Sequence, residues 1–147
     1  MNIVEVAIRL LKFRSHSQYE LEQKLLKHGY DELAVNQAIE YLTERGYLND
    51  AALCDILIAK HAEMSKYSLQ ETFLRLRRKG LSADLIKTKL AEWDEEFEYQ
   101  AALKLAAKYL RVNECEDVTK VIRRMSAKGY KATTVRKVLE RLIDMAP

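Results

Sequence analysis

The sequence predicts an all-α protein built as an elongated tandem array of three three-helix repeats. Its 147 residues contain only four Gly and one Pro, so little in the chain would interrupt helices or supply the tight turns of a β fold. Gly29, Gly80 and Gly129 recur about fifty residues apart, and each follows a basic or imidazole side chain. Apolar residues stand at the same helical offsets after each glycine, which indicates one helical unit repeated three times.

The second helix of each repeat is predicted from its two ends. Ser17, Ser68 and Asp117 stand twelve residues before the glycines, and all three are favoured N-cap residues. A Glu stands three residues after each serine, a spacing that satisfies side-chain and backbone donors at a helix start. Each glycine can adopt the left-handed conformation that ends a helix. We therefore expect three helices of about eleven residues that begin at these caps.

The third helix of each repeat follows the glycine. Asp31 and Ser82 can cap it in the first two repeats, whereas Lys131 breaks the pattern in the third. Its core side is predicted from apolar residues six, ten and thirteen positions after each glycine, namely Val35, Ile39, Leu42, Ile86, Leu90, Trp93, Val135, Leu139 and Leu142. We expect the three residues at the middle offset, Ile39, Leu90 and Leu139, to be equivalent buried positions.

The first helix of each repeat is an amphipathic segment, predicted at 3–13, at 50–61 after the cap Asn49, and at 97–110. Boundaries near 47–49 and 94–96 divide the chain into repeats at 1–49, 50–93 and 94–147. Acids gather at the second boundary, where we expect a linker, a hinge or a solvated helix start: Glu92, Asp94, Glu95, Glu96 and Glu98.

Composition limits the class of protein. With 48% hydrophobic and 32% charged residues the chain is typical of a globular protein, and a net charge of +3 does not by itself indicate a nucleic-acid or membrane partner. Cys54 and Cys115 cannot form a disulfide framework, and Cys54 lies in an apolar run as a small buried thiol would. The first residues lack a basic region, and no apolar run approaches the ~18 residues of a membrane span, so we expect a cytoplasmic protein.

The placement of the cations is more informative than their number. Residues 118–139 and 72–83 contain no acid, and Lys24, Arg75 and Arg124 share one repeat position, five residues before the glycine. Stacked repeats would set these three along one face, which would suit a polyanionic or acidic filament, although a solvated helix face is the more ordinary explanation of any single cation. The candidate partner-binding or nucleic-acid-binding residues are Lys24, Arg75, Arg77, Arg78, Lys79, Lys120, Arg123, Arg124 and Lys128.

Catalytic and metal-binding interpretations find little support. His16, His28 and His61 have no metal-ligand spacing with either cysteine, and no phosphate-binding loop or nucleophile motif occurs, so we expect no enzyme, metal or cofactor. Helix-turn-helix readout of DNA sequence is disfavoured because the first candidate recognition helix, 31–44, is acidic. Tyrosines could stack on bases, but those just past the glycines, such as Tyr130, are better explained as contacts across a helix end.

Three segments resemble the RecX family of bacterial recombination regulators. They are Phe13-Arg14-Ser15-His16-Ser17-Gln18-Tyr19-Glu20-Leu21, Gly46-Tyr47-Leu48-Asn49-Asp50 and Leu76-Arg77-Arg78-Lys79-Gly80-Leu81-Ser82. Their order and spacing match the family over nearly the whole chain. The middle repeat departs from it at Leu53-Cys54 and Tyr67-Ser68-Leu69. The resemblance implies a protein that lies in the groove of the RecA–DNA filament and modulates, usually inhibits, its ATPase and strand-exchange activities.

Three functions therefore stay open at the level of the sequence. The first is a regulator, expected to be a monomer, that binds the groove of the recombinase filament. The second is a non-specific DNA-binding protein that competes for recombination substrates. The third is an adaptor for an unrelated acidic protein.

Overall fold

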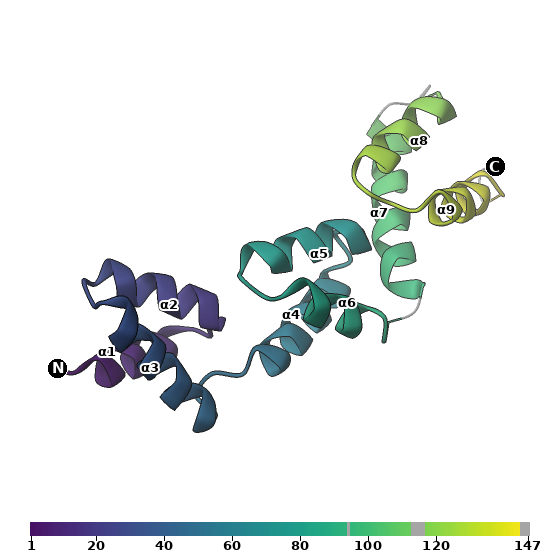
Figure 1. Ribbon diagram of the computed structural model, residues 1–147. Helices are drawn as coiled ribbons and strands as arrows, with labels where there is room; N and C mark the ends of the chain where they lie inside the picture. The colour runs from purple at the N-terminus through teal and green to yellow at the C-terminus, as the bar shows by residue number, and fades with distance from the viewer. Residues whose placement is uncertain (94, 113–116, 145–147) are drawn as a thin grey trace. The chain divides into compact units, whose positions relative to one another are not determined.

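The computed structural model describes residues 1–93, 95–112 and 117–144, and this part of the chain is entirely α-helical between its turns (Figure 1). The all-α prediction is confirmed. In chain order the helices are α1 (Ile3–Phe13), α2 (Gln18–Lys27), α3 (Glu32–Glu44), α4 (Asp50–Met64), α5 (Leu69–Arg78), α6 (Ala83–Leu90), α7 (Glu96–Val112), α8 (Val118–Ala127) and α9 (Ala132–Asp144).

The chain forms two compact units, each of which is described by itself. Unit 1 contains residues 1–57 and 76–86, and unit 2 contains residues 58–75 and those from 87 onward. The helices α4, α5 and α6 contribute residues to both units. The two predicted boundaries between the three repeats stay a prediction, because these units follow packing and not the sequence register.

The core of unit 1 lies where α1, α2 and α3 pack together. Leu21 and Leu25 are one turn apart on α2 and fully buried, and Val35 and Leu42 of α3 are buried against them. Ala7 is the buried residue of α1. Because each helix buries one stripe, its remaining faces are free to carry charge.

The core of unit 2 is formed by α7, α8 and α9. Three alanines of α7, Ala101, Ala102 and Ala106, are fully buried, so neighbouring helices can approach it closely. The helix α8 contributes only Val121 and Met125, which are one turn apart. A single buried stripe leaves the rest of α8 exposed.

The predicted helix ends are confirmed in all three repeats. Ser17 forms a capping box with Glu20, the Ser68 hydroxyl accepts a hydrogen bond from the Glu71 amide at 3.1 Å, and Asp117 accepts one from Thr119 at 3.0 Å. The three glycines have φ of 95°, 91° and 92°, in the region that ordinary side chains avoid. The backbone amides just after them reach back to close the preceding helix, as expected of glycine C-caps.

One prediction about the core was wrong. Leu139 is buried, but Ile39 and Leu90 are only half-buried, so the three are not equivalent. In α3 the buried stripe passes through Ala38 and Leu42, which moves Ile39 to its flank. Leu90 is the last residue of the short helix α6. The offset six residues after the glycine is the one that is buried throughout, at Val35, Ile86 and Val135.

A buried carboxylate connects two helix starts in unit 2. Glu98 of α7 is 1% exposed; its Oε1 accepts the Leu69 amide at 3.1 Å, and its Oε2 accepts the Lys131 amide at 3.2 Å and the Thr134 hydroxyl at 2.8 Å. Leu69 and Lys131 stand at the N-terminal ends of α5 and α9, where amides lack helical acceptors and the helix dipole is positive. Glu98 therefore satisfies donors at the start of α9, where Lys131 has no side-chain oxygen to act as an N-cap.

The same junction brings the α8–α9 turn against the start of α5. The Ser68 hydroxyl donates to the Lys128 carbonyl at 2.9 Å, and Gly129 lies so close to Gln70 that a Cβ would stand 2.9 Å from the Gln70 Cβ. One serine thus caps its own helix and satisfies a carbonyl at the end of another.

Unit 1 contains a matching junction. The Ser17 hydroxyl donates to the Lys79 carbonyl, and the Gln18 amide donates to the Asp50 carboxylate at 3.0 Å. Gly80 lies directly against the Tyr19 side chain, as Gly129 lies against Gln70. The two units therefore contain the same arrangement, in which a Ser cap, a glycine turn and an acid at the start of a following helix lie together.

These contacts correct the prediction for the acidic residues at the second repeat boundary. Glu95 is exposed and pairs with Lys137 at 3.0 Å, as a solvated helix start would. Glu98 instead has a buried structural role, and Asp94 lies outside the described residues.

We predict that Glu98→Gln lowers the free energy of unfolding by about 1.5–3 kcal/mol, because the amide keeps the volume but loses the charge that accepts three hydrogen bonds. Denaturant unfolding followed by circular dichroism measures it. Glu95→Gln, directly before the same helix and exposed, is the matched control and should change little. Equal effects of the two substitutions would contradict the role assigned to Glu98.

A second prediction separates backbone strain from close approach. Gly29→Ala should cost about 1–2 kcal/mol, from its positive φ alone, because nothing lies within 4 Å of the added Cβ. Gly80→Ala has nearly the same φ but places its Cβ on the rigid Tyr19 Cβ, so it should cost at least about 1 kcal/mol more. Thermal and denaturant unfolding of both variants test the difference. Equal costs would refute the tight junction in unit 1.

Candidate functional site

The structure distributes the nine predicted cations over both units. Lys24, Arg77, Arg78 and Lys79 belong to unit 1, and Arg75, Lys120, Arg123, Arg124 and Lys128 belong to unit 2. A shared face for Lys24, Arg75 and Arg124 therefore stays a prediction. The local environment of each cation shows which of them are already engaged within the chain.

Two of the unit 1 cations are held by neighbouring groups. The Lys24 Nζ lies 2.8 Å from His16 Nε2, and His16 Nδ1 lies 2.8 Å from the Arg14 carbonyl. Burial lowers the pKa of His16, which favours a neutral ring that accepts from Lys24 and donates to the carbonyl. Arg77 donates to the Leu81 carbonyl at 2.8 Å and closes the end of α5. The exposed side chains of Arg78 and Lys79 follow it in sequence.

Arg75 is also engaged. Its guanidinium lies 3.8 Å from the centre of the Tyr67 ring, and its Nε lies 3.1 Å from a Glu71 carboxylate oxygen. Tyr67 precedes the Ser68 cap, as His16 precedes the Ser17 cap. In the first two repeats, the cation five residues before the glycine therefore packs against the ring that precedes the helix cap. This packing within the chain explains why Lys24 and Arg75 recur at one repeat position, so no binding partner is needed to account for it.

The helix α8 presents the most available cations. Lys120, Arg124 and Lys128 follow one another at intervals of four residues, and Arg123 adjoins them, so all four lie toward one side of the helix. All four are exposed, and α8 itself contains no acid. Arg124 lies 5.4 Å from the centre of the Tyr109 ring, whereas Lys120 and Arg123 form no ion pair with the described residues.

Unit 2 also contains an open groove of about 680 Å³ that the sequence did not reveal. Its walls are residues 64–68 with Glu71 and Arg75 on one side, one face of α7 on another, and Lys128 with Tyr130 at the α8–α9 turn. Two predicted cations, Arg75 and Lys128, meet there. The groove adds three cations that were missed, Lys66, Lys104 and Lys108. The last two are four residues apart on α7, a helical spacing that could have identified them.

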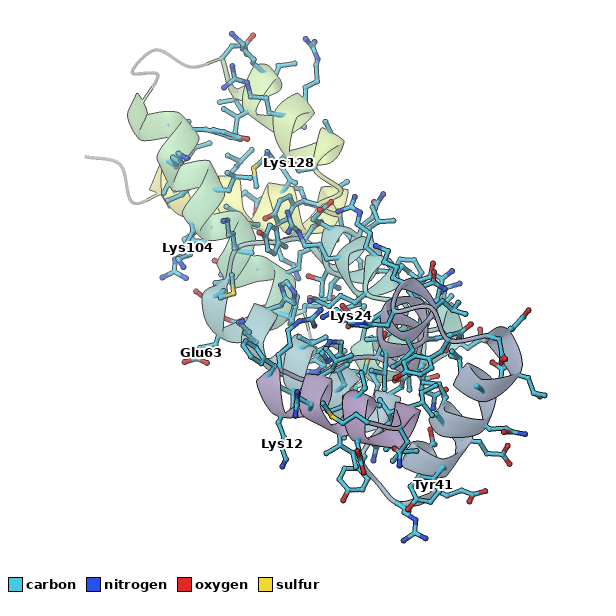
Figure 2. The ribbon with its side chains drawn as sticks, turned by 90° about the vertical axis from the view of Figure 1, so that its left-hand side faces the viewer. Lys12, Lys24, Tyr41, Glu63, Lys104 and Lys128 are labelled. Atoms are coloured by element: carbon cyan, nitrogen blue, oxygen red, sulfur yellow. The ribbon has the colours of Figure 1, made fainter. Side chains whose placement is uncertain are left out.

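The groove is shaped by the turn after α4. Ser65 has φ of 48° and directs the chain from α4 into the groove wall. Lys104, labelled with Lys128 in Figure 2, donates to the Met64 carbonyl at 2.9 Å and so neutralises the C-terminal end of α4. Tyr130 is buried, and desolvation together with the Glu98 charge raises its pKa to about 12. At neutral pH it is therefore an uncharged part of the groove floor.

The described residues do not assemble a metal centre. No group of three or more His, Cys, Asp or Glu side chains lies close enough to hold a metal ion in the part of the chain that the structure covers. Cys54 is fully buried, which agrees with its interpretation as a core thiol, and Cys115 lies outside the described residues. Among the described helices, none is both long and apolar enough to cross a membrane.

Comparison with known proteins identifies the family. The family model described as RecX, first three-helix domain, matches residues 5–50. A regulatory protein RecX from Pelodictyon phaeoclathratiforme is 30% identical over 138 residues, covering 93% of this chain and 86% of the relative. The RecX of Chlorobium limicola is 28% identical over 142 residues, covering 96% and 89%. The crystal structure of RecX from Lactobacillus salivarius has the same fold, with a TM-score of 0.87 at 16% identity over 97% of this chain and 95% of that one. The chain belongs to the RecX family.

Proposed function

We propose that this protein regulates recombination by binding in the groove of a RecA–DNA filament and inhibiting its ATPase and strand-exchange activities. Membership of a family whose relatives are named regulatory proteins, over 93% of the chain, supports the regulatory role. The exposed, acid-free cationic side of α8 is the observation that carries the contact with a polyanionic filament. In this proposal the protein acts in the cytoplasm as a monomer, and performs no chemistry.

The cations that should contact the filament are those that are not already engaged within the chain. Lys24, Arg75 and Arg77 are committed to a ring nitrogen, a tyrosine face with a carboxylate, and a carbonyl. Breaking those contacts to reach a phosphate would cost stability in the protein itself. Lys120 and Arg123 are exposed on α8 and can reach a phosphate at little internal cost.

A direct DNA-binding function is the alternative, and the same side of α8 favours it. Phosphate contacts need only several exposed cations and no particular base sequence. The two functions predict different relative affinities for the filament and for naked DNA. A filament regulator should bind the assembled filament more tightly than naked DNA, whereas a competitor should bind naked DNA at least as tightly. Co-sedimentation with preformed filaments, in parallel with DNA alone, distinguishes them.

We predict that Lys120→Glu combined with Arg123→Glu weakens filament binding and ATPase inhibition while leaving helicity unchanged, because both residues are exposed. The slope of log affinity against log salt should fall by about one for each duplex-DNA phosphate that the variant no longer neutralises, and by somewhat less for a single strand. Co-sedimentation across a salt series measures both quantities.

The matched control reverses two exposed cations of unit 1, Lys12→Glu and Lys27→Glu, which changes the net charge equally. It should lower affinity less than the α8 variant and leave the salt slope closer to that of the unaltered protein. If the two double variants behaved alike, net charge and not the α8 surface would explain the binding.

A further inference from the structure

The groove of unit 2 has a charge pattern that calls for an anionic ligand. Five cations line it, and its one carboxylate, Glu71, is paired with Arg75. Lys66, Lys104, Lys108 and Lys128 are all exposed and come from three separate parts of the chain, so they surround the groove instead of forming one helix face. Fields from several like charges around a concave surface add within it.

The interior of the groove is apolar between these cations. Met64, Leu105 and Tyr130 line it, together with the small residue Ala101. Met64 is 40% exposed, although a methionine side chain is readily buried by a partner. An apolar floor with a cationic margin suits a ligand that carries apolar and acidic groups side by side.

The rings of the groove are not available for stacking on bases. Tyr67 has the Arg75 guanidinium over its face and the His61 ring 5.4 Å away, and Tyr130 is buried. Single-stranded nucleic-acid sites rely on open aromatic faces for much of their affinity. These contacts therefore favour a peptide over a nucleic acid.

We propose that this groove is a docking site for an acidic amphipathic helical segment of a partner protein. Its apolar stripe would cover Met64 and Leu105, and its carboxylates would meet the surrounding lysines. Lys104 and Lys108 are four residues apart, a rise of about 6 Å, which equals the spacing of glutamates one turn apart on a docked helix. The site is separate from Lys120 and Arg123, which do not line the groove.

Fluorescence anisotropy on the full chain tests this site with three short probes: a helical peptide with a leucine stripe flanked by glutamates, its Glu→Gln counterpart, and an oligothymidine. The glutamate peptide should bind at least about tenfold more tightly than the other two. Equal or tighter binding of the Glu→Gln peptide would overturn the charge complementarity, and tighter binding of oligothymidine would assign the groove to nucleic acid instead.

Two variants then locate the site. Lys108→Glu with Lys128→Glu should weaken peptide binding at least about tenfold, whereas Lys108→Arg with Lys128→Arg should retain it. Lys120→Glu with Arg123→Glu, the variant aimed at the filament, should leave peptide binding unchanged. A failure of the filament-binding test would therefore not contradict the proposed peptide site in the groove. Peptide binding that persists in the Lys108 and Lys128 reversal, with helicity intact, would overturn the proposal.

Discussion

The Glu98 carboxylate is the group on which the organisation of unit 2 depends. A buried charge is costly unless it is fully hydrogen-bonded, and here two helix N-termini and a threonine hydroxyl supply the donors. The same contacts hold the start of α5 and the start of α9 against α7, and the bond from Ser68 to the Lys128 carbonyl holds the α8–α9 turn beside them. The groove lies among these parts, so its shape follows from the junction.

The junction also changes how the recurrent cations are understood. Lys24 and Arg75 stand at one repeat position because each packs against a ring that precedes a serine cap, and the caps belong to the junctions. In a repeat protein, a residue type that recurs at one position therefore indicates a shared packing contact before it indicates a shared binding role. The cations best placed for a partner are those that packing does not use, such as Lys120 and Arg123 on α8 and Lys108 beside the groove.

Much of the fold was predictable because its signals are local. Ser17, Ser68 and Gly129 act on residues a few positions away, and their caps and positive φ were predicted from spacing alone. The sequence alone places Glu98 in a linker, a hinge or a solvated helix start, because its partners are 29 to 36 residues away and nothing in the adjacent sequence reveals them. The groove was missed for the same reason: its lysines come from three segments that only the tertiary structure brings together. Lys120 and Arg123 were selected from the acid-free stretch 118–139, and the structure shows both to be exposed, while their role in binding stays a prediction.

Native-state hydrogen exchange of the Leu69 and Lys131 amides tests the central role of the junction most directly. Amides at helix starts have no helical acceptor and ordinarily exchange by small local openings. If Glu98 holds both helix starts, these two amides should be protected nearly as well as those in the middle of α7, and both should lose protection together in Glu98→Gln. Exchange of either amide at the rate of an exposed helix start in the unaltered protein would contradict the account.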